Sequence, residues 1–137
     1  MPTPAAMPIL TKADAEAMMA DFFADWIREL NIRFDQIGPE EVVLRLPLAE
    51  RLYRVGGTVC GQALLALADT TMVFTISAAL GGYRPMTTVN QSTNFMKPIS
   101  GADVIARGRP LRIGKSMAFG EVLPAVQVSS AYALLPA

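Results

Sequence analysis

The chain has 137 residues, which suits a single domain over residues 1–137 and is too short for two. Its twelve basic and twelve acidic residues cancel, which argues against the clustered positive surface that nucleic-acid binding requires. Hydrophobic residues make up 52% and charged residues 18%, so we expect part of the surface to lie in a subunit interface. The N-terminus has no secretory signal pattern and the chain has one cysteine, which together predict a cytoplasmic protein.

The first part of the chain predicts an arm, a helix and two strands. Residues 1–10 contain three prolines and are expected to form a flexible arm. Thr11 and Asp14 form a capping pair for an N-terminal helix within residues 11–31, whose aromatic and methionine stripe we interpret as core. Alternating residues then predict strands at 32–37 and 41–46.

A long apolar helix follows the loop at residues 47–58. From residue 63 to 80, apolar residues occupy nearly every helical face, which is typical of a helix that is buried on all sides. Gly81-Gly82 is expected to end it. A membrane span is the competing interpretation, but polar residues interrupt the apolar stretch at 59–80, which favours the core helix of a soluble protein.

The last part of the chain predicts four strands, at residues 86–96, 102–113, 116–123 and 126–135. An apolar helix followed by antiparallel strands is best satisfied by a sheet wrapped around it, so the predicted fold class is α+β. One connection is unexpected, because Leu123-Pro124-Ala125-Val126 has no Gly, Asn or Asp to support a tight turn. Either the strand register shifts there or several loop residues are absent from this chain, and we favour the second explanation.

Asp69 is the most informative residue, because it places a carboxylate in the middle of the apolar helix. An ionised carboxylate is costly to bury without a partner. It is therefore either satisfied by Thr70, by Thr71 or by a neighbouring strand, or it belongs to a functional site. The residue alone favours neither explanation. As a catalyst, Asp69 could act as a general base for water or as a direct nucleophile.

The start of the same helix offers a second group of interest. The segment Val59-Cys60-Gly61-Gln62 would bring free N–H groups and the positive end of the helix dipole together, which suits an oxyanion. The glycines alone are better explained by a turn and a packing contact, since short glycine patterns are common. The chain has no histidine to activate Cys60, so a packing role is favoured for this thiol.

The spacing of Gly61 and Asp69 favours a site shared by two chains. Eight residues along one helix correspond to about 12 Å at roughly 1.5 Å per residue. An N–H group and a carboxylate at that separation cannot both touch one small carbonyl group. Two copies of the helix lying antiparallel in a dimer could bring the N–H of one chain to the carboxylate of the other.

Several motifs, taken in order, resemble the hotdog-fold thioesterases of the phenylacetate-degradation (PaaI-like) type. They are Gly57-x-x-Cys60-Gly61-Gln62, Leu67-Ala68-Asp69-Thr70, the segment VNQSTNFMKP at 89–98, Gly101, and the turn Leu111-Arg112-x-Gly114-Lys115. The similarity covers roughly residues 41–133. It implies a hotdog fold, with an antiparallel sheet wrapped around a long central helix and here an extra N-terminal helix. This extra helix is expected to cover the end of the sheet or the entrance for the acyl group. It also implies hydrolysis of acyl-CoA thioesters by a homodimer or homotetramer with sites between subunits.

The resemblance implies roles for individual residues. Asp69 matches the catalytic aspartate, and Gly61 matches the glycine whose N–H polarises the thioester carbonyl, with the N–H of Gln62 beside it. Thr88 falls where relatives carry a hydroxyl that helps position the attacking water. Tyr53-Arg54 stands where relatives usually carry a His-Asn pair, and Cys60 where they usually carry histidine.

Coenzyme A enters as part of the substrate, and no metal or redox cofactor is implied. Its phosphates are expected to meet basic residues, and Arg107 and Arg109 share one strand face. Ordinary solvated sheet surface also explains the basic residues and is the favoured explanation for them taken alone. The residues that we predict to contact coenzyme A are Arg54, Cys60, Lys97, Arg112 and Lys115.

The predicted function is a thioesterase for small or medium acyl-CoA substrates, and two alternatives remain. The replacements at Tyr53-Arg54 and Cys60 leave room for a non-catalytic acyl-CoA-binding or regulatory hotdog protein. A hotdog dehydratase or hydratase would need an aspartate–histidine pair, and the lack of histidine disfavours it.

Overall fold

The computed structural model describes residues 9–123 and 126–136. Residues 1–8 of the arm predicted at 1–10, and the connection at Pro124-Ala125, therefore lie outside the described residues. Leu10, the last residue of that predicted arm, is buried in the core, so the prediction of a flexible arm is wrong for this residue. In chain order the elements are α1 (Lys12–Phe22), α2 (Asp25–Arg28), β1 (Arg33–Ile37), β2 (Val42–Leu46), the 3-10 helix η1 (Glu50–Leu52), α3 (Gly61–Leu80), β3 (Met86–Phe95), β4 (Val104–Ile113), β5 (Met117–Leu123) and β6 (Val126–Leu134).

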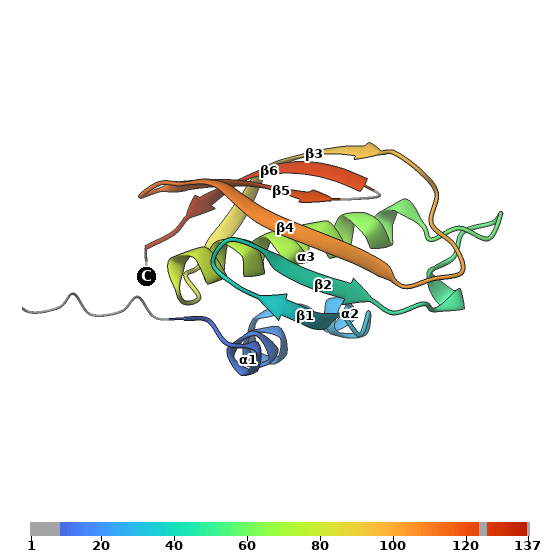
Figure 1. Ribbon diagram of the computed structural model, residues 1–137, viewed down its shortest axis with the longest axis horizontal. Coiled ribbons are helices and arrows are strands. Elements are labelled where there is room, and N and C mark those ends of the chain that lie inside the picture. The colour runs from blue at the N-terminus through green and yellow to red at the C-terminus, as the bar shows by residue number, and fades with distance from the viewer. Residues whose placement is uncertain (1–8, 124–125, 137) are drawn as a thin grey trace, which may run out of the picture.

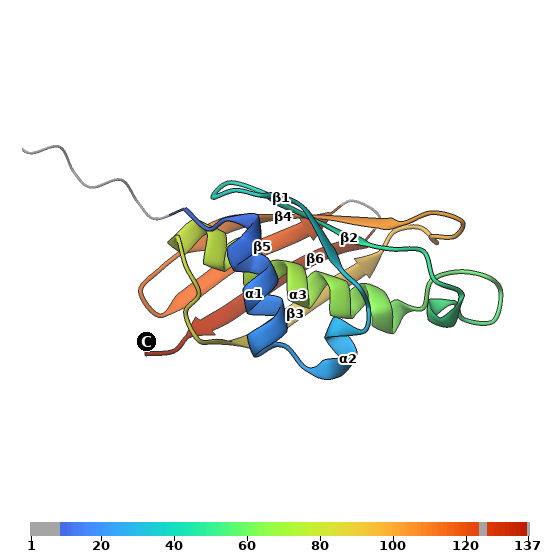
Figure 2. The same ribbon diagram turned by 90° about the horizontal axis from the view of Figure 1, so that it is seen from below.

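The strands form one antiparallel sheet in the order β1-β2-β4-β5-β6-β3. The sheet curves around α3, which runs along its concave side (Figure 1). Seen from below, α1 and α2 lie in front of α3, on the side that the sheet leaves open (Figure 2). The predicted α+β class is confirmed, and the bounds of every predicted strand agree closely with the observed ones.

Helix α3 is the core of the fold. It ends at Gly81, which adopts the left-handed conformation with φ 79° and donates its N–H to the carbonyl of Ala78 at 3.2 Å. The helix is long and apolar enough to cross a membrane, but 67% of its most apolar stretch is buried inside the fold. Its hydropathy is therefore explained by the sheet around it, and the predicted end at Gly81-Gly82 is confirmed.

Two glycines let the sheet approach α3 closely. A Cβ on Gly108 of β4 would come within 2.9 Å of Cγ2 of Thr71 and still closer to the hydroxyl of Thr75. A Cβ on Gly120 of β5 would meet the end of the Met72 side chain. The two strands thus have glycine, which has no side chain, at the points where they pack against α3. This lets the strand backbone approach the helix closely.

The single N-terminal helix predicted within residues 11–31 is instead two helices, separated by Phe23 and Ala24. Both residues have extended backbone, with ψ 150° and 151°. The break lets Phe23 stack on Phe74 of α3, with ring centroids 5.3 Å apart, while Phe22 and Trp26 stay 56% and 57% exposed. The prediction of an all-core aromatic stripe is therefore wrong for Phe22 and Trp26. The capping box of Thr11 with Asp14 is confirmed.

Candidate active site

The carboxylate of Asp69 is held by side chains of two strands. Its Oδ1 accepts a hydrogen bond from Oγ1 of Thr88 on β3 at 2.9 Å and another from the phenol of Tyr132 on β6. Thr71 does not contribute, because its hydroxyl bonds to the carbonyl of Leu67 at 2.7 Å. Of the partners considered from the sequence, the neighbouring strand is therefore the right one. Oδ2 has no hydrogen-bond partner among the residues that the structure describes.

Tyr132 is a site residue that the sequence analysis missed. It is 1% exposed, and its hydroxyl also lies 3.1 Å from the main-chain oxygen of Asp69. Burial raises the pKa of the Tyr132 phenol far above its ordinary value, the charge of Asp69 and the bond to it raise it further, and the Thr88 hydroxyl lowers it. Alternation along β6 places Tyr132 on the same buried face as Val128 and Leu134. A buried phenol needs a partner, and this was the signal that could have found it.

A β-bulge in β3 aims the side chains around Asp69. Thr88 pairs directly with Tyr132, but the next pair is Asn90 with Ala131, so Val89 is the extra residue. After a bulge the strand alternation is shifted by one position. Thr88 and Gln91, three residues apart, consequently both face α3, and the amide of Gln91 donates a long hydrogen bond of 3.5 Å to the carbonyl of Leu65.

An open hollow of about 410 Å³ lies beside Asp69. Helix α2 contributes one wall, α3 forms the floor and β3 the other wall. An apolar surface next to a carboxylate is a suitable place for an acyl group close to an acid–base residue. The lining residues are Trp26, Gln62, Leu65, Ala66, Asp69 and Gln91.

The start of α3 leaves three N–H groups free of protein partners. The N–H groups of Val59 and Cys60, which the sequence analysis counted as free, bond instead to the carbonyls of Ile99 and Leu52 at 2.9 and 2.8 Å. No side chain caps the helix, and its first internal bond is the one from Leu64. Within the described residues the unpaired donors are therefore those of Gly61, Gln62 and Ala63, which suit a developing negative charge.

A second hollow, of about 460 Å³, lies at this helix start. Gly61 lines it together with Arg54, Lys97 and the ring of Phe95. A Cβ on Gly61 would stand 3.3 Å from that ring, closer than most side chains tolerate, so the packing of Phe95 at the helix start favours glycine at this position. The remaining lining residues are Thr58, Val59, Leu64, Met96, Pro98 and Ile99.

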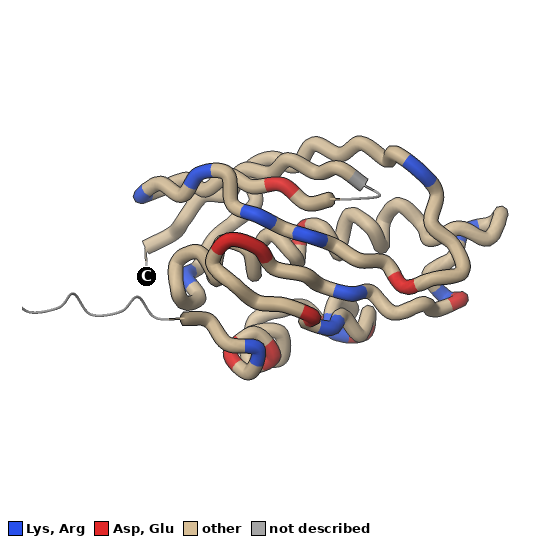
Figure 3. Tube along the Cα trace, in the orientation of Figure 1, with Lys and Arg blue, Asp and Glu red and all other residues tan. Residues whose placement is uncertain are grey.

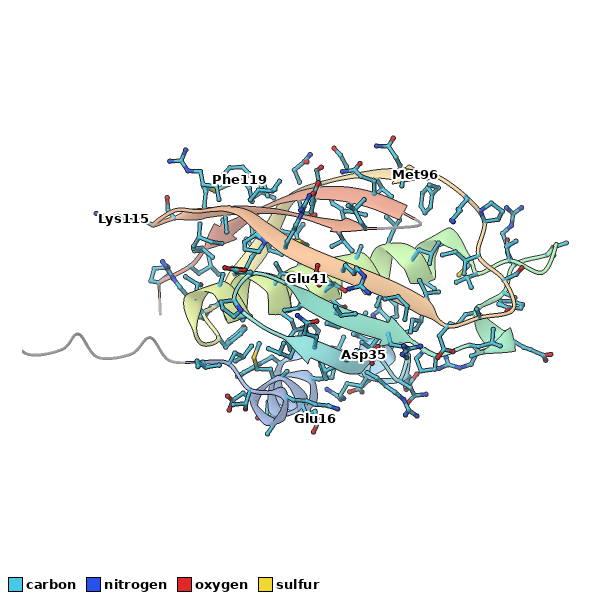
Figure 4. The ribbon with its side chains drawn as sticks, viewed as in Figure 1. Glu16, Asp35, Glu41, Met96, Lys115 and Phe119 are labelled. Atoms are coloured by element: carbon cyan, nitrogen blue, oxygen red, sulfur yellow. The ribbon has the colours of Figure 1, made fainter. Side chains whose placement is uncertain are left out.

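The predicted contacts with coenzyme A fall into two separate places. Arg54 and Lys97 share the hollow with Gly61, whereas Arg112 and Lys115 belong to the β4–β5 hairpin. Figure 4 shows Lys115 at the opposite end of the molecule from Met96, the neighbour of Lys97. A single chain therefore does not bring the two pairs together.

The remaining basic residues of β4 form ion pairs on the surface of the sheet. Arg107 forms an ion pair with Glu41 at 3.3 Å, and Arg109 forms one with Glu121 at 2.6 Å. Figure 3 shows basic and acidic residues interspersed over these strands. The explanation as solvated sheet surface thus fits Arg107 and Arg109.

Tyr53 and Cys60 have structural positions. The Tyr53 hydroxyl accepts a hydrogen bond from the N–H of Gly101 at 2.8 Å, which ties the loop after β3 to the loop before α3. Cys60 is a free, half-buried thiol packed against the core, and it does not line the hollow at the helix start. Across residues 9–123 and 126–136, no three His, Cys, Asp or Glu side chains lie close enough together to hold a metal ion.

A curved antiparallel sheet around one long helix is the architecture of the hotdog fold. In this chain the helix also carries an acid, Asp69, and unpaired N–H groups at its start. Residues 56–123, which include Asp69 and the start of α3, match the thioesterase superfamily. A Thermoplasma acidophilum protein named as an esterase is 32% identical over 110 residues, covering 80% of this chain and 83% of that protein. The chain belongs to the thioesterase superfamily and is by class a thioester hydrolase.

Solved structures agree with this assignment. A protein from a Silicibacter species named as a thioesterase has 27% identity and a TM-score of 0.82, and the match covers 96% of this chain and 97% of that one. The PaaI protein from the phenylacetic acid degradation operon of Escherichia coli has a TM-score of 0.78 over 90% of this chain and 92% of that one. At 13% identity the second likeness concerns the fold alone. The predicted hotdog fold is confirmed.

Proposed function

We propose that the chain hydrolyses acyl-CoA thioesters with small or medium acyl groups, and that Asp69 is the general base or the nucleophile. The observation that carries this proposal is the geometry of its carboxylate. One oxygen is occupied by Thr88 and Tyr132, while the other has no partner among the described residues, and the residue lines an open hollow. An acid that is held but only half satisfied is ready to accept a proton.

In the general-base route, Asp69 takes a proton from water, and the water oxygen attacks the thioester carbonyl carbon. The Thr88 hydroxyl oxygen can accept a hydrogen bond from that water and so help to orient it. The N–H groups of Gly61 and Gln62 receive the oxyanion that forms. When the carbon–sulfur bond breaks, the proton on Asp69 passes to the departing coenzyme A thiolate. These steps need no metal or redox cofactor.

We further propose that each site is built by two copies of the chain. The spacing of about 12 Å between Gly61 and Asp69 along α3 is too large for one small carbonyl group. β3 is the last strand of the sheet and, among the described residues, pairs only with β6. An exposed ten-residue edge that carries Val89 at 59% and Phe95 at 54% exposure favours pairing with a second copy. A homodimer, or a homotetramer built from it, follows.

In this arrangement, Arg54 and Lys97 receive the phosphates of coenzyme A in the hollow beside Gly61. Arg112 and Lys115 would reach the same molecule only from another subunit, and Cys60 does not line this hollow. The acyl group occupies the hollow lined by Trp26 and Leu65. Acyl-CoA substrates and a free thiol both suit the cytoplasm.

The decisive variant is Asp69→Asn. It keeps the shape of the side chain and removes its basicity, so we expect kcat to fall by at least about 100-fold in a panel of acyl-CoA substrates followed by thiol release. Asp21→Asn, a change at an exposed residue of α1, is the matched control and should behave as the parent. Undiminished hydrolysis by Asp69→Asn would refute the catalytic role. A parent protein that binds acyl-CoA but hydrolyses none of the panel would instead be a binding or regulatory protein.

A mass measurement in solution tests the shared site. We expect a dimer or tetramer, and a protein that hydrolyses substrate as a strict monomer would exclude the two-chain arrangement.

A further inference from the structure

We propose that Tyr132 is a positioning residue, whose phenol acts with Thr88 to hold Asp69 in one orientation and leave Oδ2 as its reactive oxygen. The inference rests on the proposed function of Asp69 and adds a residue to it. Tyr132 is 63 positions from Asp69 in the sequence and does not line the hollow beside it.

The strand pairing provides the geometry. Thr88 and Tyr132 are directly opposite each other on β3 and β6, so their side chains reach the same oxygen of Asp69 from adjacent strands. The terminal torsion of an aspartate is soft and broadly distributed, so a free carboxylate can exchange its two oxygens. Two donors fixed to a sheet remove that freedom, which is how supporting hydrogen bonds preorganise a reacting group.

The protonation state of the phenol determines whether Tyr132 can act as a hydrogen-bond donor or as a base. Because burial and the nearby carboxylate raise its pKa, the phenol keeps its proton and is a donor rather than a base. At 1% exposure it does not reach the substrate. Its effect on the reaction must therefore pass through Asp69.

The competing explanation is that Tyr132 only fastens α3 to the sheet. Its hydroxyl lies 3.1 Å from the Asp69 main-chain oxygen, and a bond to that atom alone would serve this purpose. The phenol has one proton, and the carboxylate is the stronger acceptor of the two because it is charged. A donor on a carboxylate stabilises its ionised form, whereas an anchor on the main chain does not.

This difference gives a pH test, because Tyr132 is the one titratable side chain that the described structure bonds to Asp69. From α2, α3 and β3, the other residues around the hollow are uncharged, namely Trp26, Gln62, Leu65, Ala66 and Gln91. A shift in the acid limb of the pH–rate profile can therefore be assigned to the lost phenol.

The experiment compares Tyr132→Phe with the parent. We expect kcat to fall roughly tenfold with little change in KM, and the acid limb of the pH–rate profile to move to higher pH. Tyr83→Phe is the matched control, since Tyr83 stacks on Phe22 at 4.3 Å and its hydroxyl has no bond among the described residues. In the Asp69→Asn background, adding Tyr132→Phe should cause no further loss of residual activity.

A second variant covers the case in which Tyr132→Phe does not fold. Replacing Tyr132 with 3,5-difluorotyrosine keeps the ring and hydroxyl but makes the phenol a stronger donor, so the acid limb should move to lower pH. An acid limb that stays at the parent position in the folded variant, with a loss that multiplies with that of Asp69→Asn, would overturn the proposal. Should Asp69→Asn itself retain full activity, the proposed function fails first, and the two failures are thus distinguishable.

Discussion

The polar residues on the two faces of α3 differ in where their hydrogen-bond partners come from. On the face toward β4 and β5, Thr71 and Thr75 are buried, and their hydroxyls bond to main-chain carbonyls of their own helix at 2.7 and 2.8 Å. On the face toward β3 and α2, Asp69 takes its partners from two strands and keeps one oxygen without a described partner. One helix is thus sealed core on one side and reaction surface on the other.

The difference teaches where the site can form. Gly108 and Gly120 bring the sheet so close to the first face that no room remains for a ligand. The second face is bounded by a one-turn helix and an edge strand, which leave a hollow of about 410 Å³. Variants that act on only one face can therefore separate stability from activity.

The largest effect should come from a change on the face of α3 that packs against β4 and β5, and it should be an effect on stability. Gly108→Ala places a Cβ against Thr71 and Thr75, which are stiff β-branched residues with little freedom to move. We expect the free energy of unfolding in urea to fall by about 1–3 kcal/mol. The kcat of the protein that remains folded should change little.

Gly82→Ala is the matched control for this change. A Cβ at Gly82 would have no neighbour within 4 Å, so its effect on stability should be small. Equal unfolding free energies for Gly108→Ala and the parent would show that the helix can move away from the sheet and that the first face is not sealed.

The sealed face was largely predictable from the sequence, because it depends on periodic patterns. The continuous apolar pattern of α3, the alternation of the strands and the stop at Gly81-Gly82 all have local signals. The break at Phe23-Ala24 has none, since neither residue is glycine or proline. Tertiary packing of Phe23 on Phe74 decided it.

The reaction face was predictable only in part. Asp69 stood out because a carboxylate is rare in such a helix, and Thr88 came from the family resemblance. Tyr132 lies 63 positions away from Asp69, and the bulge at Val89 that aims Thr88 and Gln91 has no distinctive residue. A contact between distant strands and a one-residue change of register leave little trace in a single sequence.

An intermediate effect is expected at the wall of the reaction face. Trp26→Ala removes an exposed side chain that lines the hollow beside Asp69. We expect kcat/KM for an apolar acyl-CoA to fall about tenfold, equivalent to about 1.4 kcal/mol, with little change in unfolding free energy. Phe22→Ala is the control, because Phe22 is similarly exposed but does not line this hollow. A loss of kcat/KM of the same size in Phe22→Ala would show a general effect of the N-terminal helices.

The smallest effect is expected on KM, from the basic residues Lys97, after β3, and Lys115, in the β4–β5 hairpin. Lys97→Ala should raise KM for an acyl-CoA about threefold at low salt, because an exposed charge contributes only modestly and is screened as ionic strength rises. Lys12→Ala, which removes an exposed charge from α1, should leave KM unchanged. Lys115→Ala decides between the two ends of the molecule, since in one chain Lys115 is remote from Gly61. We expect it to raise KM less than Lys97→Ala does. A larger rise would mean that the phosphates are bound at the hairpin of a neighbouring subunit.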